Sequence, residues 1–250
     1  MNSKQFAIFC TQILATLAFL STSVIAAPIN YGDFNGTTVM YLDVTESSAT
    51  DTVPLFGPPN INGDTLDFDP FEFSVVSTGG GVEIMDVQLN FDLVGAGGID
   101  SLLIQEGGDF SLIGTGTSST SVTAAVSVRI EIYEVDGAPI TPIIVSANNS
   151  IARNLVSDGT VTLESWGNGV LVDFASLLIA NNIDSQVGVT GAEIVINDQL
   201  IATSESGSGS FIAKKDFKIG VNPVPVPAAV WLFGSGLLGL VGIARRKKVA

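Results

Sequence analysis

Alternation of apolar and polar residues dominates the middle of the chain and limits what it can fold into. The clearest example is residues 121–132, where every second side chain is apolar. These apolar positions are Val122, Ala124, Val126, Val128, Ile130 and Ile132. Because successive side chains of a β-strand point to opposite faces, this spacing predicts a strand with one buried and one exposed face. Val87, Leu89, Phe91 and Leu93 predict a second strand in the same way.

Turn residues divide the remaining sequence into further short strands. Asp136-Gly137 predicts a hairpin turn into a strand over residues 140–145, which Pro142 places at a sheet edge. Val82 and Ile84 occupy even positions, whereas the apolar residues from Val87 onward occupy odd ones. An extra residue in the strand would bring both sets to the same face, so this change predicts a β-bulge near Met85. Other strands are expected at residues 39–45, 66–76, 160–164, 170–174, 193–196, 200–204 and 211–219, with one brief helix at 177–182. This pattern predicts an all-β fold, an antiparallel β-sandwich or jelly roll, over residues 27–221.

Residue usage excludes several kinds of active site. The 250 residues include no histidine, so Ser-His-Asp and Cys-His mechanisms are impossible. The single cysteine, Cys10, lies in the apolar N-terminal run, so residues 27–221, the body of the chain, contain no disulfide. The stability of this body must therefore come from a buried core. No motif selects two of the 25 acidic residues as a glycosidase pair. We therefore expect a non-enzymatic protein.

Charge is distributed unevenly along the chain. The net charge is −15, and five of the ten lysines and arginines lie near the termini, where there are no acids. The middle segment is therefore strongly acidic and repels other polyanions, so a nucleic-acid partner is not expected.

The first 26 residues have the features of a secretory signal peptide. Lys4 is followed by an apolar stretch over residues 6–20 and by the small residues around Val24-Ile25-Ala26. This arrangement predicts export through the Sec translocon and cleavage by signal peptidase after Ala26.

The C-terminus predicts a membrane anchor. Residues 228–244 carry no charge and as a helix would be about 25 Å long, just enough for a bilayer core. Positions that characterise this predicted transmembrane helix are Ala228, Trp231, Gly236, Gly239 and Ala244. The basic tail that follows over residues 245–250 contains Arg245, Arg246, Lys247 and Lys248. Four bases beside an apolar span stay in the cytoplasm, which puts the acidic body outside the inner membrane.

Residues 222–227 form a Pro-rich linker in front of this helix, ending in Pro225, Val226 and Pro227. The stretch from Val224 to Lys248 resembles the sorting signal of PEP-CTERM proteins, although Val226 stands where that family's name has Glu. The resemblance implies sorting by an exosortase in a Gram-negative bacterium that makes exopolysaccharide. It implies an inner-membrane-anchored precursor that then moves to the cell surface or extracellular matrix.

Two features of the body suggest ligands. Asp64, Asp67 and Asp69 crowd around Gly63 and offer the oxygen ligands of a calcium site, although a solvated acidic turn is the alternative. Trp166 is the best candidate for a ring that stacks on sugar, with a packed core position as the alternative. We expect no cofactor other than calcium. The leading interpretation is an exosortase-sorted matrix protein associated with exopolysaccharide, and the alternative is a calcium-assisted carbohydrate-binding module.

The basic tail provides a test of the sorting signal. Replacing Arg245, Arg246, Lys247 and Lys248 by Ser should let the C-terminus cross the membrane, because positive charge is what holds it in the cytoplasm. Unprocessed protein should then accumulate in the periplasm or medium of a host that has an exosortase. Cell fractionation with an antibody to the body of the chain measures this. Processing of the mutant as efficient as that of the wild type would contradict the sorting role.

Overall fold

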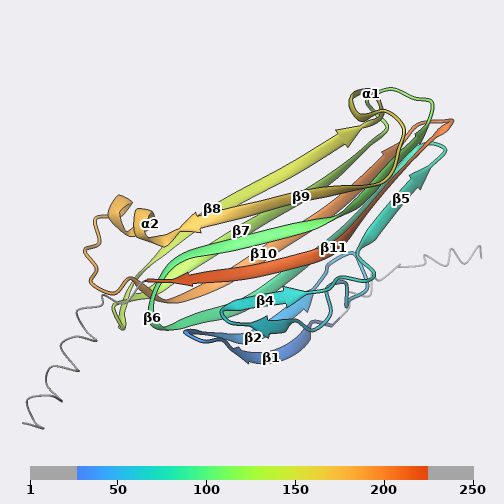
Figure 1. The fold of residues 1–250 in the computed structure, drawn as a ribbon. Coiled ribbons are helices and arrows are strands. Elements are labelled where there is room, and N and C mark those ends of the chain that lie inside the picture. The colour runs from blue at the N-terminus through green and yellow to red at the C-terminus, as the bar shows by residue number, and fades with distance from the viewer. Residues whose placement is uncertain (1–26, 225–250) are drawn as a thin grey trace, which may run out of the picture.

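The computed structural model describes residues 27–224, most of which lie in β-strands (Figure 1). The elements, in chain order, are β1 (Ile29–Asn35), β2 (Val39–Ser47), β3 (Asn60–Asn62), β4 (Thr65–Phe68), β5 (Ser74–Thr78), β6 (Gly81–Gly114), β7 (Ser121–Val135), β8 (Ala138–Asn154), α1 (Leu155–Asp158), β9 (Val161–Asp173), α2 (Phe174–Ala180), β10 (Val189–Ser204) and β11 (Ser208–Pro223). Every strand pair is antiparallel. The predicted all-β antiparallel sandwich is confirmed.

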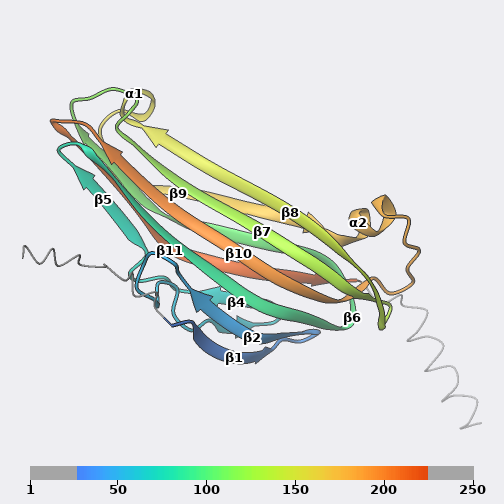
Figure 2. The same cartoon turned by 180° about the vertical axis from the view of Figure 1, so that it is seen from behind.

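Strand β6 takes part in both layers of the sandwich. The strand is 34 residues long. Its first part, residues 81–95, pairs with β10 and β2, and its second part, residues 99–114, pairs with β11 and β9. A side chain at Gly98, between these halves, would place its Cβ 1.5 Å from the carbonyl oxygen of Val187, so only glycine fits the bend. Figures 1 and 2 show the two resulting layers face to face, with β1, β2, β10, β7 and β8 in one and β4, β5, β11 and β9 in the other.

Apolar side chains of both layers fill the space between them. The alternating positions of β7 from Val122 to Ile132 are all at most 1% exposed, as their spacing predicts. A group of aromatic rings extends this core, and the centroids of Phe56 and Phe217 lie 4.6 Å apart. Because the described residues include no cysteine, this burial is what holds the layers together.

Two pairs of predicted strands are in fact single strands. The predicted strands 193–196 and 200–204 form one strand, β10, which runs straight through Asn197, Asp198 and Gln199. The prediction was wrong there because Asp198 is not a turn residue but is buried, contacting the side chain of Lys214. The predicted strands 160–164 and 170–174 are likewise one strand, β9, in which Trp166 points into the core.

Two further predictions differ from the structure. The single strand expected over residues 66–76 is two strands, β4 and β5, with Asp69 and Pro70 between them. The bulge expected near Met85 does not exist, because β6 keeps an unbroken register with β10 from Gly81 to Val94. The strand alternates regularly, and Val82 and Ile84 are apolar residues on its outer face, where they are 56% and 52% exposed.

The hairpin and the brief helix are confirmed. Asp136 and Gly137 have φ angles of 53° and 72°, the positive values required by a tight turn between the twisted strands β7 and β8. Strand β8, which contains Pro142, ends the path of paired strands. Helix α2 covers most of the predicted helical residues.

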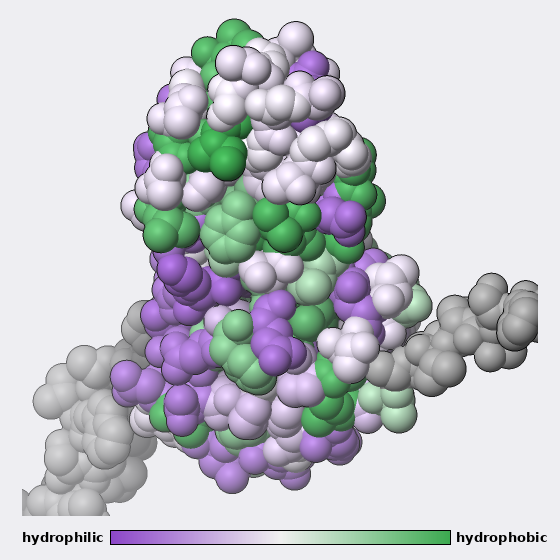
Figure 3. All heavy atoms as spheres, turned by 90° about the vertical axis from the view of Figure 1, so that its right-hand side faces the viewer, coloured by the Kyte–Doolittle hydropathy of each residue, from purple (hydrophilic) through white to green (hydrophobic). Residues whose placement is uncertain are grey.

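The surface is least polar toward the end of the sandwich that carries α1 and β5. Figure 3 shows apolar and weakly polar residues gathered there and hydrophilic residues in the opposite half. Exposed apolar side chains of the elements near this end are Val76, Val82, Ile84, Ile113, Val156 and Leu163.

One buried carboxylate fixes the long loop that follows β2. Glu46 is fully buried and accepts hydrogen bonds from the backbone N–H groups of Leu55, Phe56 and Gly57 and from the hydroxyl of Tyr31. Burial and, to a smaller extent, the hydrogen bond to Glu46 raise the pKa of Tyr31 above its ordinary value. The phenol therefore keeps its proton and remains a hydrogen-bond donor.

Glu46→Ala tests the role of this carboxylate. It leaves buried N–H groups without acceptors, so we expect the free energy of unfolding to fall by about 3 kcal/mol or more. Glu193→Ala, which removes an exposed glutamate of β10, should change it by less than about 0.5 kcal/mol. Urea denaturation measures both, and equal stability of the two variants would contradict this account.

Candidate functional site

The predicted sorting residues lie at the end of the chain, beyond the described part. Residues 225–227, 228–244 and 245–248 fall outside the described range 27–224. Strand β11 ends at Pro223 and therefore leads into this segment. No helix within residues 27–224 has the length and apolar character needed to cross a membrane.

The three aspartates proposed for calcium take separate partners. The carboxylate of Asp64 accepts hydrogen bonds from the backbone N–H of Thr38 at 2.7 Å and from its hydroxyl at 2.7 Å. The carboxylate of Asp67 lies 3.6 Å from the ammonium of Lys218, and Asp69 is exposed. Within residues 27–224 no three acidic side chains form a group that could hold a metal ion. Calcium binding stays a prediction from the sequence.

Trp166 occupies a packed core position, the alternative to the sugar-stacking role considered from the sequence. Its side chain is 5% exposed, and its Nε1–H donates to the carbonyl of Ala213 at 3.1 Å. A ring held this way has no free face for sugar.

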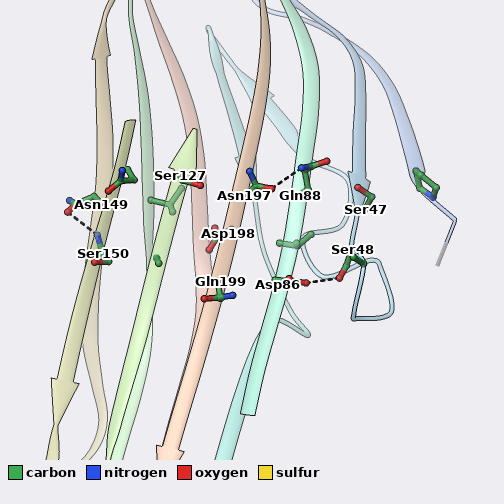
Figure 4. A pocket seen from close by; sticks show the side chains of 16 residues that line it. Ser47, Ser48, Asp86, Gln88, Ser127, Asn149, Ser150, Asn197, Asp198 and Gln199 are labelled. Atoms are coloured by element: carbon green, nitrogen blue, oxygen red, sulfur yellow. Dashed lines mark hydrogen bonds between the residues drawn. The ribbon is translucent and has the colours of Figure 1, made fainter. Parts of the chain in front are cut away.

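A groove on the outer face of one layer is the best candidate for a binding site. It has a volume of about 660 Å³ and crosses β2, β6, β10, β7 and β8. At about 4.8 Å between neighbouring strands, five strands span about 19 Å. Figure 4 shows Gln88, Asn197, Gln199 and Ser127 side by side on adjacent strands. Small side chains at Ala125 and Ser127 of β7 leave the space that the longer amides border.

The groove presents mainly neutral groups that both donate and accept hydrogen bonds. Its amide side chains are Gln88, Asn148, Asn197 and Gln199. Asn149 contributes only through its strand, because its amide donates to the carbonyl oxygen of Gly169 on β9, in the other layer, at 2.9 Å. The Nε2 of Gln88 donates to the Oδ1 of Asn197 at 2.8 Å, which orients both amides. A network of this kind suits a ligand rich in hydroxyl groups.

One half-buried carboxylate, that of Asp86, borders the groove. The Oδ1 of Asp86 accepts hydrogen bonds from the hydroxyls of Ser48 at 3.0 Å and Thr50 at 2.5 Å. Asp198 also contributes to the lining through its strand, but its side chain is buried on the opposite face. No lysine or arginine is among the residues that line the groove, so it offers no positive charge to an anionic ligand.

The alternation that predicted the strands did not identify this groove. Ser127 was assigned to the solvent-facing side of its strand, and residues 197–199 fell between two predicted strands. Only the pairing of β7 with the continuous β10 brings these residues together. The signal was present in residue type, because Ser127, Asn197 and Gln199 are neutral where a solvated face usually carries charge.

Comparisons with known proteins bear mainly on the C-terminus. Residues 223–248 match the family model of the PEP-CTERM protein-sorting motif. No curated protein matches the chain.

Two solved structures show distant similarity. One is TmCBM61 in complex with beta-1,4-galactotriose, with 11% identity, a TM-score of 0.20 and coverage of 64% of this chain and 70% of that chain. The other is the infectious bursal disease virus VP2 subviral particle, with 13% identity, a TM-score of 0.15 and coverage of 84% and 58%. At such TM-scores neither likeness carries an argument about this chain. The chain carries a PEP-CTERM sorting motif at its C-terminus.

Proposed function

We propose that this chain is an exported, non-enzymatic protein of the envelope or extracellular matrix, and that its groove holds a neutral exopolysaccharide. The sorting motif at residues 223–248 supports delivery by an exosortase. The observation that carries the binding role is the row of neutral amides and hydroxyls across five strands.

Charge favours a neutral polymer over an acidic one. The chain carries a net charge of −15, and the one charged side chain that faces the groove is the half-buried carboxylate of Asp86. A polyuronate would be repelled by both the groove and the surface around it.

The lining also sets the strength of binding. None of the residues that line the groove is aromatic, so hydrogen bonds rather than ring stacking hold the polymer. Each such hydrogen bond replaces hydrogen bonds that the groove and the polymer make with water, so its net contribution to binding is only about 1 kcal/mol. Binding is therefore weak at one groove, and many copies on one polymer give lasting association.

The alternative function is a calcium-assisted carbohydrate-binding module. Its acidic residues, Asp64, Asp67 and Asp69, belong to the β3–β4 region rather than to the groove. This alternative predicts that polysaccharide binding disappears when calcium is removed, whereas the neutral groove binds equally well with a chelator present.

Affinity electrophoresis of the secreted protein tests the groove. We expect gels containing a neutral β-glucan or β-galactan to retard the protein and gels containing a polyuronate to leave it unaffected. The double variant Asn197→Ala/Gln199→Ala should weaken retardation by roughly tenfold or more, because two hydrogen-bonding groups are lost.

Thr203→Ala is the matched control, since Thr203 lies on the same strand outside the groove. Equal retardation of the double variant and the wild type would remove the groove from the proposal. Loss of retardation on chelation of calcium would favour the alternative.

A further inference from the structure

A lysine is buried between the two layers, where charged side chains are rare. Lys214 of β11 is 1% exposed, and its ammonium contacts the carboxylates of Glu106 on β6 and Asp198 on β10. All three side chains are shielded from solvent. Lysine and acids are almost never fully buried unless they are paired.

The alternation of β11 places Lys214 on its inward face. Lys214 lies two residues after the buried Ile212 and faces the core with it, whereas Lys215 faces away. The register shift against β6 between Lys214 and Asp216 then brings Phe217 to the same inward face. Lys215 is exposed and pairs with Asp109 at the surface. Gly108, opposite Lys214, has no room for a side chain, because its Cβ would lie 1.9 Å from the carbonyl oxygen of Ala213.

Aromatic rings enclose the amine. The Nζ of Lys214 lies 5.1 Å from the ring centroids of Phe73 and Phe217 and 5.8 Å from that of Phe56. Rings at this distance attract a cation, but they also exclude the water that would solvate it. An ion pair in such a setting contributes little net stability, because desolvation offsets the attraction between the charges.

The two acids around the amine are not equivalent. The Oε1 of Glu106 accepts a hydrogen bond from the Nδ2 of Asn168 at 2.6 Å, whereas the Oδ1 of Asp198 is buried without any hydrogen-bond partner. Burial, together with the nearby Glu106 carboxylate, raises the pKa of Asp198 to about 7 against the opposing effect of Lys214. Asp198 therefore holds a proton at higher pH than an ordinary aspartate does. A protonated carboxyl group is a better electrophile than a carboxylate.

We propose that Lys214 and Asp198 become joined by an intramolecular amide bond between Nζ and Cγ, with Glu106 as the proton carrier. The bond would link β11 of one layer to β10 of the other. It requires only the three side chains that the structure already places in contact.

The reaction balances within this cluster. A proton passes from the ammonium of Lys214 to the carboxylate of Asp198, leaving a neutral amine beside a carboxylic acid. The amine attacks Cγ, and Glu106 takes a proton from the attacking nitrogen. Glu106 then returns that proton to the departing hydroxyl group, so the C–O bond breaks, water leaves and Glu106 is again a carboxylate. Neither an oxidant nor an activated leaving group is needed.

Peptide mass spectrometry of the full chain tests the bond directly. No lysine or arginine lies between Arg153 and Lys214, so trypsin places Asp198 and Lys214 in one peptide. In the wild type we expect a peptide covering residues 154–215, uncleaved after Lys214 and lighter than its sequence by one water. Fragment ions from bonds between residues 198 and 214 should be missing, because the crosslink keeps both sides together.

Variants identify the groups involved. Asp198→Ala and Glu106→Gln should each give the full sequence mass and cleavage after Lys214. Asp109→Ala, which removes an acid that pairs with the neighbouring Lys215, should keep the loss of water. The wild-type result does not depend on how well the variants fold. A wild-type peptide of full mass that trypsin cleaves after Lys214 would overturn the proposal.

Discussion

The two layers of the sandwich share strand β6, and the rest of the fold depends on the bend that carries it from one layer to the other. Pairing with β10 and β2 before the bend, and with β11 and β9 after it, sets the register of four other strands. Gly98 makes the bend possible by letting the backbone approach Val187. Because both layers grow from one strand, their inner faces are aligned and a single apolar core fills the space between them.

That core tolerates charge only where every charge has partners. Glu46 is held by three backbone N–H groups and a phenol, and Lys214 by two carboxylates within an aromatic enclosure. Removing one member of such a group leaves the others desolvated and unpaired, which is why these sites specify a particular arrangement of the chain. The outer face obeys a different constraint, since amides there remain in contact with water and free to exchange it for a ligand.

Sequence patterns predicted the strands whose polar and apolar faces are separate. β7 was recognised because its inward residues are all apolar, and its hairpin because Asp136-Gly137 has a strong turn preference. β10 was divided because Asp198 is polar yet faces inward, and no local pattern indicates that a lysine sixteen residues later contacts it. The groove was missed for a related reason, because it exists only once five strands lie side by side. The sorting motif was recognised because its order of residues is read locally, without any tertiary contact.

The position of β11 has a mechanical consequence. This strand is hydrogen-bonded to β6 along one edge and to β4 and β5 along the other, and it ends at Pro223, where the sorting motif begins. A force applied through the C-terminal segment therefore acts along the axis of an interior strand. Both ladders of hydrogen bonds resist it together in shear, whereas an edge strand pulled from its end can peel away one bond at a time. A protein held to a surface by this end can bear drag on its body without its last strand being the first part to give way.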